Sequence, residues 1–405
     1  MNALAEPIAA PAERAQVLDL INAAWTTQAI RAACVLRVPD SLAAGSHDAE
    51  SLAADLGCHA PSLQRLLRAL VTIGLCSVDD HGRYTLTPSG ELLREGHAHS
   101  VRAWALLAGG AIWQRWSELD HSVRSGISHR RRHGADDGFH DLALSPAAAV
   151  QFHRAMVEMT RAIAGAVART IDPVGMQQVV DVGGGSGELL AHVLAAHPSL
   201  HGVLFDLPHG LEGAASVLDR AGVAARCTRV AGSFFDTLPV GGDLYLLKSV
   251  LHNWDDARCV PILRACRSAM APRGRVLVIE RLMADRPGTT PHDRAVARSD
   301  LNMLVALSGR ERTANDFAAL FAQAGLALER NLGRAGDFSL LQLRAGCGRA
   351  PSGLQPAPAP AGAGPLAGAR QHAGAVVRPA QAQRLAANAA RSAAKRPGSC
   401  RCGEC

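Results

Sequence analysis

The chain has 405 residues, of which 48% are hydrophobic and 19% charged, a composition typical of a soluble globular protein with room for two domains. Its formal net charge of +6 does not favour nucleic-acid binding, because the last sixty residues hold eight Arg and Lys against a single acid, Glu404. The rest of the chain is close to charge balance.

The N-terminal residues are not expected to form an export signal. Met1 to Arg14 lack the basic start and long apolar core of a signal peptide, and the longest apolar stretch, 103–113, is too short to span a membrane.

Six cysteines are scattered through apolar or helical contexts, so we expect reduced thiols and a cytoplasmic protein. The C-terminal residues Cys400, Cys402 and Cys405 form a C-x-C-x-x-C pattern. The sequence shows neither a fourth ligand nor a predicted fold around them, so we predict no metal site there.

Residues 15–100 are predicted to form a winged-helix unit. Asp48 is a helix N-cap residue and Gly57 a helix C-cap residue. The predicted elements are helices over 15–45, 48–57 and 60–73, then two strands, 75–78 and 84–87, around a turn.

A winged helix suggests DNA binding, but the helix over 60–73 offers only Arg65 and Arg68 among many leucines. A recognition helix presents several polar or basic side chains to a groove. The alternative, which we favour, is an interaction module that buries apolar helices against a partner subunit.

Residues 101–170 are predicted to be helical, with a loop at about 124–138. The run His-Arg-Arg-Arg-His at 129–133 is most simply a solvated loop, and a patch for an acidic partner is the alternative. Three apolar side chains recur at helical spacing and share one face: Phe152, Met156 and Met159. Spacing alone leaves open whether this face packs into a core or lines a pocket.

From 171 to 345 strands alternate with helices, which predicts a mainly parallel α/β sheet covered on both faces. The predicted strands are 179–182, 203–206, 227–233, 243–247 and 276–280, and a last strand, 338–343, closes the sheet. A ligand is expected at the carboxyl ends of the parallel strands. The polar residues at these ends are Asp181, Asp206, Ser233, Lys248 and Glu280.

A glycine loop follows the first of these strands. Residues Asp181 to Gly187 fit Asp-x-Gly-x-Gly-x-Gly, but not the dinucleotide fingerprint Gly-x-Gly-x-x-Gly. Glycines let a ligand approach the backbone closely and permit positive φ. The loop resembles the first motif of S-adenosylmethionine (SAM) methyltransferases; a nicotinamide site and a purely structural turn are the alternatives.

Later strand ends carry the remaining candidates. Asp206 stands where an acid hydrogen-bonds both ribose hydroxyls, in a SAM or a nicotinamide enzyme. Phe234 can stack on adenine or belong to the core. His252 follows a strand end on the cofactor side, with Glu280 and Glu311 downstream. A lone histidine is usually structural, so its role rests on the motifs around it.

Four motifs together resemble the SAM-dependent O-methyltransferases of the plant caffeate and flavonoid type and the bacterial polyketide-tailoring type. They are Val180-Asp181-Val182-Gly183-Gly184-Gly185-Ser186-Gly187, Phe205-Asp206-Leu207-Pro208-His209, Leu251-His252-Asn253-Trp254-Asp255-Asp256 and Gly309-Arg310-Glu311-Arg312-Thr313. With the winged-helix outline they cover the chain from about 15 to 345, in the family's order.

The resemblance implies a Rossmann-like SAM-binding catalytic domain with a mainly helical winged-helix dimerisation domain before it. The implied boundaries are 15–100 for dimerisation, 101–170 for a helical linker that contributes to the acceptor pocket, and 171–345 for catalysis. The implied partners are a second copy of the chain and a small hydroxylated aromatic acceptor, with no nucleic acid and no membrane.

The resemblance also implies residue roles. The general base is His252, which Glu280 and Glu311 orient. The SAM contacts are Asp181, Gly183, Gly185, Asp206, Leu207, Ser233, Phe234 and Lys248, and the acceptor contacts are Trp113, Phe152, Met156, Met159, Asn302 and Met303. The chemistry agrees, because an imidazole of pKa ~6.5 accepts a proton near pH ~7, and a phenol of pKa ~10 needs to lose one to become a good nucleophile.

One position departs from the family pattern. The chain has Gly232-Ser233-Phe234-Phe235 where the family commonly has Asp after the glycine. A hydroxyl is a shorter and neutral acceptor for the adenine amino group, and its use costs on the order of 1 kcal/mol, roughly fivefold in affinity. We therefore predict weakened SAM binding.

Two other functions compete with O-methylation. One is a non-methylating member of the same family, such as a SAM-assisted hydroxylase or decarboxylase, and the other is a SAM-sensing DNA-binding regulator. The tail over 346–405, rich in Pro, Ala, Gly and Arg, is predicted to be disordered.

Overall fold

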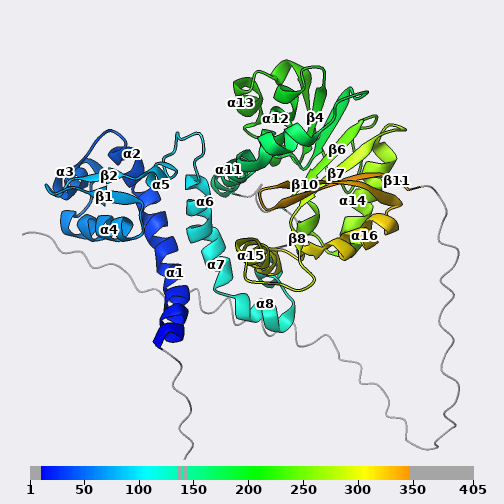
Figure 1. Cartoon of the computed structure of the whole chain (residues 1–405). Coiled ribbons are helices and arrows are strands. Elements are labelled where there is room, and N and C mark those ends of the chain that lie inside the picture. The colour runs from blue at the N-terminus through cyan, green and yellow to red at the C-terminus, as the bar shows by residue number, and fades with distance from the viewer. Residues whose placement is uncertain (1–10, 136–138, 140–144, 347–405) are drawn as a thin grey trace, which may run out of the picture. The chain divides into compact units, whose positions relative to one another are not determined.

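The computed structural model describes residues 11–135, 139 and 145–346, and Figure 1 labels its elements. The tail predicted to be disordered lies outside the described residues, apart from Gly346. Within these ranges no helix combines the length and apolar character needed to cross a membrane. The six cysteines described there are free thiols.

The N-terminal elements follow the predicted winged-helix outline. They are α1 (Pro11–Val35), α2 (Val38–Leu42), α3 (Ala49–Leu56), α4 (Ala60–Thr72), β1 (Cys76–Val78), β2 (Tyr84–Leu86) and α5 (Pro88–Glu91). As predicted, the Asp48 carboxylate caps α3 by accepting a hydrogen bond from the Ser51 N–H at 2.8 Å, and Gly57 ends the helix with a φ of 62°. The antiparallel pair β1–β2 shares an apolar core with α3 and α4 that includes Leu52 and Leu67.

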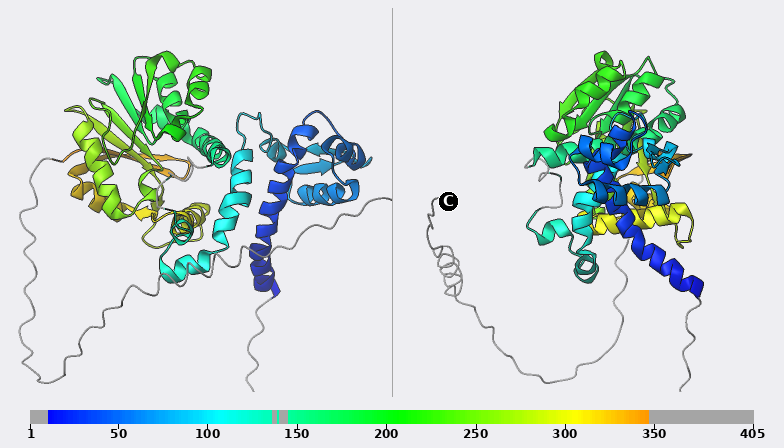
Figure 2. Two further views of the ribbon diagram at one scale, coloured as in Figure 1. Left: turned by 180° about the vertical axis from the view of Figure 1, so that it is seen from behind. Right: turned by 90° about the vertical axis from the view of Figure 1, so that its left-hand side faces the viewer.

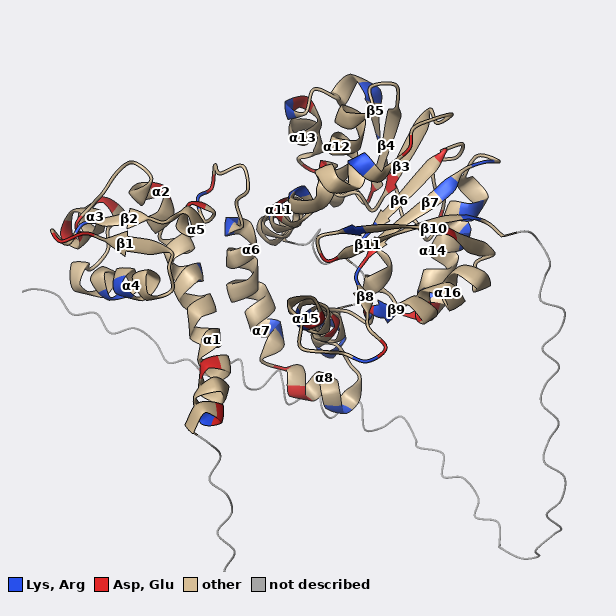
Figure 3. Cartoon of the chain, viewed as in Figure 1, with Lys and Arg blue, Asp and Glu red and all other residues tan. Residues whose placement is uncertain are grey.

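Helix α4 carries little positive charge. It buries Leu63, Leu67 and Leu70, and its only basic residues are the exposed Arg65 and Arg68. Figure 3 shows this basic stretch close to the acidic residues of α3, the helix that α4 contacts. Two exposed arginines are too few cations to match the charge of a DNA backbone.

The linker is helical, as predicted. Its elements are α6 (Arg102–Leu107), the π-helical η1 (Ala108–Ile112), α7 (Trp113–Trp116), α8 (Leu119–Ser125), α9 (His129–Arg132) and α11 (Pro146–Thr170). The prediction of a solvated loop at 124–138 is wrong for α9, which Ser128 caps by accepting a hydrogen bond from the Arg131 N–H at 3.3 Å. Arg130 is only 5% exposed, and its guanidinium lies 5.9 Å from the ring centroid of Phe139. The Ser128 cap and the packing of this cation on an aromatic ring both stabilise the turn.

Seven strands form one mixed sheet in the order β10-β11-β7-β6-β3-β4-β5. Their bounds are β3 (Gln178–Val182), β4 (His201–Asp206), β5 (Cys227–Ala231), β6 (Leu244–Lys248), β7 (Arg275–Glu280), β10 (Leu326–Ala335) and β11 (Phe338–Ala345). The strands from β7 to β5 run parallel, and β11 and β10 are antiparallel to their neighbours.

The prediction that 338–343 closes the sheet is wrong, because β11 lies between β7 and β10. Strand β10, at the edge, was not predicted. Register shifts after Leu328 and Asn331 interrupt its alternation, and only its two terminal residues are buried.

Helices cover both faces of this sheet. They are α12 (Glu188–Ala196), η2 (Pro208–Leu211), α13 (Ala214–Arg220), η3 (Ala224–Arg226), η4 (Leu251–Asn253), α14 (Asp256–Ala269), α15 (Pro291–Ala306) and α16 (Ala314–Gln323), with a two-stranded parallel pair, β8 (Leu282–Met283) and β9 (Arg312–Thr313). Val180 and Val182 pack in one apolar cluster with α14 and α16, and Val179 packs in another with α11 and α12. Figure 2 shows these helices on opposite sides of the strands. This is the doubly covered α/β sheet predicted from the sequence, whose ligand site lies at the carboxyl ends of the parallel strands.

Candidate active site

The glycine loop between β3 and α12 presents bare backbone at the carboxyl edge of the sheet. Gly183 and Gly185 have φ of 68° and 57°, a region that residues with a Cβ rarely adopt. A Cβ on Gly184 would lie 2.6 Å from both the Asp181 carboxyl group and Leu204 Cδ1. The loop therefore requires glycine for its conformation and its packing, and its bare backbone fits the methionine part of SAM.

Asp206, at the end of β4, is held against this loop. Its Oδ2 accepts a hydrogen bond from the Gly185 N–H at 2.8 Å, and its Oδ1 accepts one from the Leu207 N–H at 2.6 Å. Burial raises the pKa of Asp206, although these two N–H donors favour the ionised form. The oriented carboxylate keeps lone pairs for further donors, as ribose hydroxyls would be.

Asp181, which is buried, and Lys248, which is half-buried, are titratable groups at the same edge. Burial and the charge of Asp206 raise the pKa of Asp181 to about 7, and Asp181 Oδ2 has no hydrogen-bond partner among the described residues. Burial lowers the pKa of Lys248 to about 8, against the attraction of Glu280. A buried polar atom without a partner is the kind of group that a bound ligand satisfies.

Ser233 and Phe234 follow β5. A Cβ on Gly183 would lie 3.7 Å from Phe234 Cε1, so this ring packs over the glycine loop. The Ser233 hydroxyl accepts a hydrogen bond from the Phe235 N–H at 3.2 Å and so caps the turn. The predicted SAM contacts thus gather at one edge of the sheet, and their contact with SAM stays a prediction.

His252 lies in η4, shortly after β6, and is 8% exposed. Its Nδ1 lies 3.0 Å from Glu311 Oε1 and 3.7 Å from Glu280 Oε2. Because a carboxylate only accepts hydrogen bonds, Nδ1 of the neutral ring carries the proton and Nε2 is the acceptor. The structure therefore brings together the three residues predicted to be catalytic, from three separate segments.

The two carboxylates have different surroundings. Burial disfavours the imidazolium, but the charges of Glu280 and Glu311 outweigh burial and raise the pKa of His252. Burial raises the pKa of Glu280. At Glu311 burial acts in the same direction, but the charge of His252 and the hydrogen bonds from His252 and Ser299 together outweigh it and lower the pKa. Glu280 Oε1 also accepts hydrogen bonds from the N–H groups of Leu251 and His252, at 2.8 and 3.3 Å. Glu311 is therefore the direct ionised partner of the imidazole, and Glu280 mainly holds the backbone of η4.

Arg312, which the sequence did not single out, fixes the segment around His252. It is fully buried and donates hydrogen bonds to the carbonyl oxygens of Leu251 at 2.9 Å and Trp254 at 2.7 Å. It also donates to Asp256 Oδ1 at 2.7 Å. Its place in the motif Gly309-Arg310-Glu311-Arg312-Thr313, directly after Glu311, is the signal that could have found it.

Two residues of α15 hold Glu311. The Ser299 hydroxyl donates a hydrogen bond to Glu311 Oε1 at 2.6 Å, and Asp300 Oδ1 accepts one from the Glu311 N–H at 2.8 Å. No local pattern marks Ser299, because its partner is a loop residue beyond the end of the helix.

Aromatic rings connect α11 with the turn after β5. The ring centroid of Phe139 lies 5.9 Å from that of Phe152 and 6.4 Å from that of Trp254, which in turn lies 6.0 Å from Phe234. Met156 packs in the same apolar cluster as Phe152. Two residues that were not predicted as site residues, Phe139 and Trp254, thus join the predicted acceptor side to the predicted cofactor side.

The other predicted acceptor contacts lie on α7, α11 and α15. Met303 is buried in a cluster with Phe139, and Asn302 Oδ1 accepts a hydrogen bond from Trp116 Nε1–H at 3.0 Å. Trp113 is 39% exposed, and Met159 is half-buried. Their contact with an acceptor stays a prediction.

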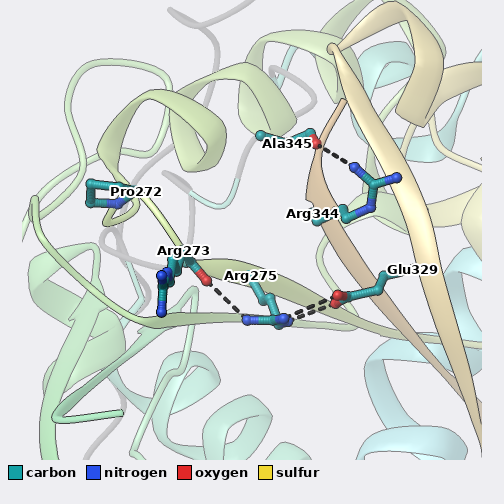
Figure 4. A pocket seen from close by; sticks show the side chains of 7 residues that line it. Pro272, Arg273, Arg275, Glu329, Arg344 and Ala345 are labelled. Atoms are coloured by element: carbon teal, nitrogen blue, oxygen red, sulfur yellow. Dashed lines mark hydrogen bonds and ion pairs between the residues drawn. The ribbon is translucent and has the colours of Figure 1, made fainter. Parts of the chain in front are cut away.

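The cavity in Figure 4 lies away from this site. It measures about 230 Å³ and is lined by residues 272–275, Glu329, Arg344 and Ala345. Arg275 begins β7, whereas Glu280 ends it, so the cavity is at the opposite edge of the sheet. Glu329 is already paired with Arg275, at 2.6 and 3.0 Å. The cavity contributes nothing to the cluster around His252.

Comparison with known protein families agrees with this geometry. A family model of the O-methyltransferase domain matches residues 116–327, just over half of the chain, and a model of the O-methyltransferase dimerisation domain matches residues 18–96. The chain belongs to the O-methyltransferase family.

This O-methyltransferase is similar to characterised relatives along most of its length. The phenazine O-methyltransferase of Lysobacter antibioticus is 37% identical over 328 residues, which cover 81% of this chain and 95% of that protein. Aclacinomycin 10-hydroxylase of Streptomyces purpurascens is 35% identical over 331 residues, which cover 79% of this chain and 87% of that protein. A crystal structure of an O-methyltransferase from neocarzinostatin biosynthesis, in complex with SAM and 2-hydroxy-5-methyl naphthoic acid, has a TM-score of 0.67 at 38% identity and covers 79% of this chain and 96% of that one. The enzyme is thus a SAM-dependent O-methyltransferase, which rules out the nicotinamide interpretation of the glycine loop.

Proposed function

We propose that this enzyme methylates a hydroxyl group of an aromatic or polyketide-like small molecule, with His252 as the general base. The names of two similar proteins, which contain a phenazine and a naphthoic acid, support an aromatic acceptor. So does the row of rings from Phe152 through Phe139 to Trp254, because flat apolar molecules pack well against aromatic side chains.

The observation that supports His252 as the general base is the 3.0 Å contact between His252 Nδ1 and Glu311 Oε1. It keeps a proton on Nδ1, so that Nε2, which has no hydrogen-bond partner among the described residues, takes the proton of the acceptor hydroxyl. Glu311 and Glu280 then stabilise the imidazolium, as the carboxylate of a catalytic triad does. When bound, SAM supplies a methyl group on a positively charged sulfur that leaves readily.

The residues at the sheet edge would hold SAM. Asp206 would accept hydrogen bonds from both ribose hydroxyls, Phe234 would stack on the adenine, and the backbone from Gly183 to Gly185 would receive the methionine part. Ser233 would face the adenine amino group as a neutral acceptor. In-line placement of oxygen, methyl carbon and sulfur is the remaining requirement for transfer.

A homodimer formed through the N-terminal unit is part of this proposal. Helix α1 exposes several large apolar side chains: Val17 at 55%, Leu20 at 69%, Ile21 at 61% and Trp25 at 73%. A contiguous apolar surface of this kind marks an interface. The match of 18–96 to the dimerisation domain supports a second copy of the chain as the partner.

The test is an acceptor screen with SAM, using hydroxylated phenazines and naphthoates, with mass spectrometry of the products. We expect a gain of one methylene on the acceptor and formation of S-adenosylhomocysteine, both strongly reduced in His252→Ala. A gain of oxygen without methylation would instead support the hydroxylase alternative. SAM binding without any modified acceptor across the aromatic panel would contradict the proposed acceptor class.

A further inference from the structure

A second cluster of metal-ligating side chains lies on α8 and α9. Glu118 directly precedes α8, His129 is the first residue of α9, and His133 directly follows α9. His129 Nδ1 lies 3.0 Å from Glu118 Oε2, and His133 Nε2 lies 3.0 Å from Glu118 Oε1. The centroids of the two imidazole rings are 4.4 Å apart, and the three ligand atoms all lie within 4.8 Å of one another.

We propose that Glu118, His129 and His133 bind a divalent transition-metal ion, for which Zn²⁺ is the best match. Zinc takes imidazole nitrogens and carboxylate oxygens at about 2.0–2.2 Å in tetrahedral geometry, which places neighbouring ligand atoms about 3.3 Å apart. The observed separations need only a small adjustment of side chains to reach that arrangement. Two histidines and one carboxylate also leave a fourth position open to water.

The local charges favour a cation at this position. The Glu118 carboxylate lies 3.0 Å from a ring nitrogen of each histidine and supplies the negative charge that a cation requires. Arg132, whose Nη1 lies 3.4 Å from Glu118 Oε2, is the competing cation. Arg130 instead lies over the ring of Phe139.

An ion here would join α8 to α9, which both contact α15. Helix α15 carries Ser299, the hydrogen-bond donor to Glu311. The site would thus brace the helix that positions the partner of His252. It takes no part in the methyl transfer itself, so the proposal stands apart from the proposed function.

The test is zinc titration of the full-length protein, in a background where Cys400, Cys402 and Cys405 are replaced by Ser so that the tail offers no thiolates. Cobalt(II) serves as a second probe, because its visible spectrum reports a tetrahedral site of nitrogen and oxygen ligands. Loss of an outer partner of a metal ligand costs ~10- to 100-fold in affinity, so we expect His133→Ala and Glu118→Gln to lose at least as much.

Three further variants separate this site from others. Arg132→Ala removes the competing cation, so zinc affinity should rise. His252→Ala dismantles the other group of three possible ligands, and the double variant His97→Ala/His99→Ala removes a pair of rings 6.1 Å apart; both should leave the affinity unchanged. Absence of zinc binding, or equal affinity in His133→Ala, would overturn the proposal.

Discussion

Glu311 Oε1 lies 3.0 Å from His252 Nδ1, although 59 residues separate the two in the chain. The contact exists because η4 follows strand β6, while two residues of α15 hold Glu311 directly before β9. It fixes the tautomer of the imidazole and leaves a single nitrogen to exchange a proton with the acceptor.

Replacing Glu311 by Gln should shift the pH dependence of methylation. The base is active when neutral, so in the wild type activity falls as the pH drops through a His252 pKa that the two carboxylates raise above ~6.5. Removal of one negative charge lowers this pKa, so the acid limb of kcat/KM should move to lower pH in Glu311→Gln. An acid limb that does not move, while the control Glu329→Gln at the opposite sheet edge also keeps the wild-type profile, would contradict the pairing.

Replacing Arg312 by Ala should destabilise the fold. The change leaves two carbonyl oxygens and Asp256 Oδ1 without their donor, and loss of one partner of a buried ion pair costs ~3–5 kcal/mol. Since the Asp256 side chain is half exposed, we expect about 3 kcal/mol, at the low end of that range. The free energy of unfolding in urea measures the effect.

Arg310→Ala is the matched control for Arg312. Arg310 contacts the same carboxylate at 3.1 Å, but its side chain is 45% exposed, so its removal should cost no more than ~1 kcal/mol. Similar losses in the two variants would show that the buried hydrogen bonds do not hold the His252 segment.

SAM binding should release protons near pH 7. Burial and Asp206 raise the pKa of Asp181 to about 7 in the absence of ligand, so the group is partly protonated there. A cationic ligand beside it favours the carboxylate and lowers this pKa, and the displaced proton enters the buffer. Calorimetric titration at pH 7 in buffers of different ionisation enthalpy should give different heats in the wild type.

The Asp181→Asn variant isolates this contribution. Lys248, with a pKa of about 8, adds its own release nearer pH 8, so the variant should lose mainly the part observed at pH 7. Identical proton release in the variant and the wild type would assign the effect to another group.

Replacing Ser233 by Asp should tighten SAM binding about fivefold, because a carboxylate is a stronger acceptor for the adenine amino group. The carboxylate can also accept the hydrogen bond that Phe235 N–H now donates to the serine hydroxyl, so the turn should be preserved. Calorimetry with S-adenosylhomocysteine measures the change, and Ser233→Ala serves as the control for the turn cap. Unchanged or weaker binding in Ser233→Asp would mean that this position does not face the adenine.

The sequence predicted those parts of the fold whose signals are local. The parallel strands follow from short apolar runs, and the glycine loop follows from the spacing of Asp181 to Gly187. The cap at Asp48 needed only its neighbours in the chain. His252 and Glu311 were found in family motifs and Glu280 at a predicted strand end, and the structure added which carboxylate meets the imidazole.

The features that were missed depend on contacts between distant segments. Strand β10 has a broken alternation and is defined by its pairing with β11. Arg312 gains its role from two carbonyl groups about sixty residues earlier, at 61 and 58 positions. None of these partners can be assigned from spacing along the chain.

The most direct test of the central claim compares wild type and His252→Ala on two acceptors that differ in the pKa of the reacting hydroxyl. With a phenol of pKa ~10 the variant should lose ~10²- to 10⁴-fold in kcat, the usual contribution of a general base. With an acceptor already ionised at the assay pH the loss should be below ~10-fold, because no proton remains to be removed. An equal loss on both acceptors, or no loss on either, would contradict the assignment of His252 as the base.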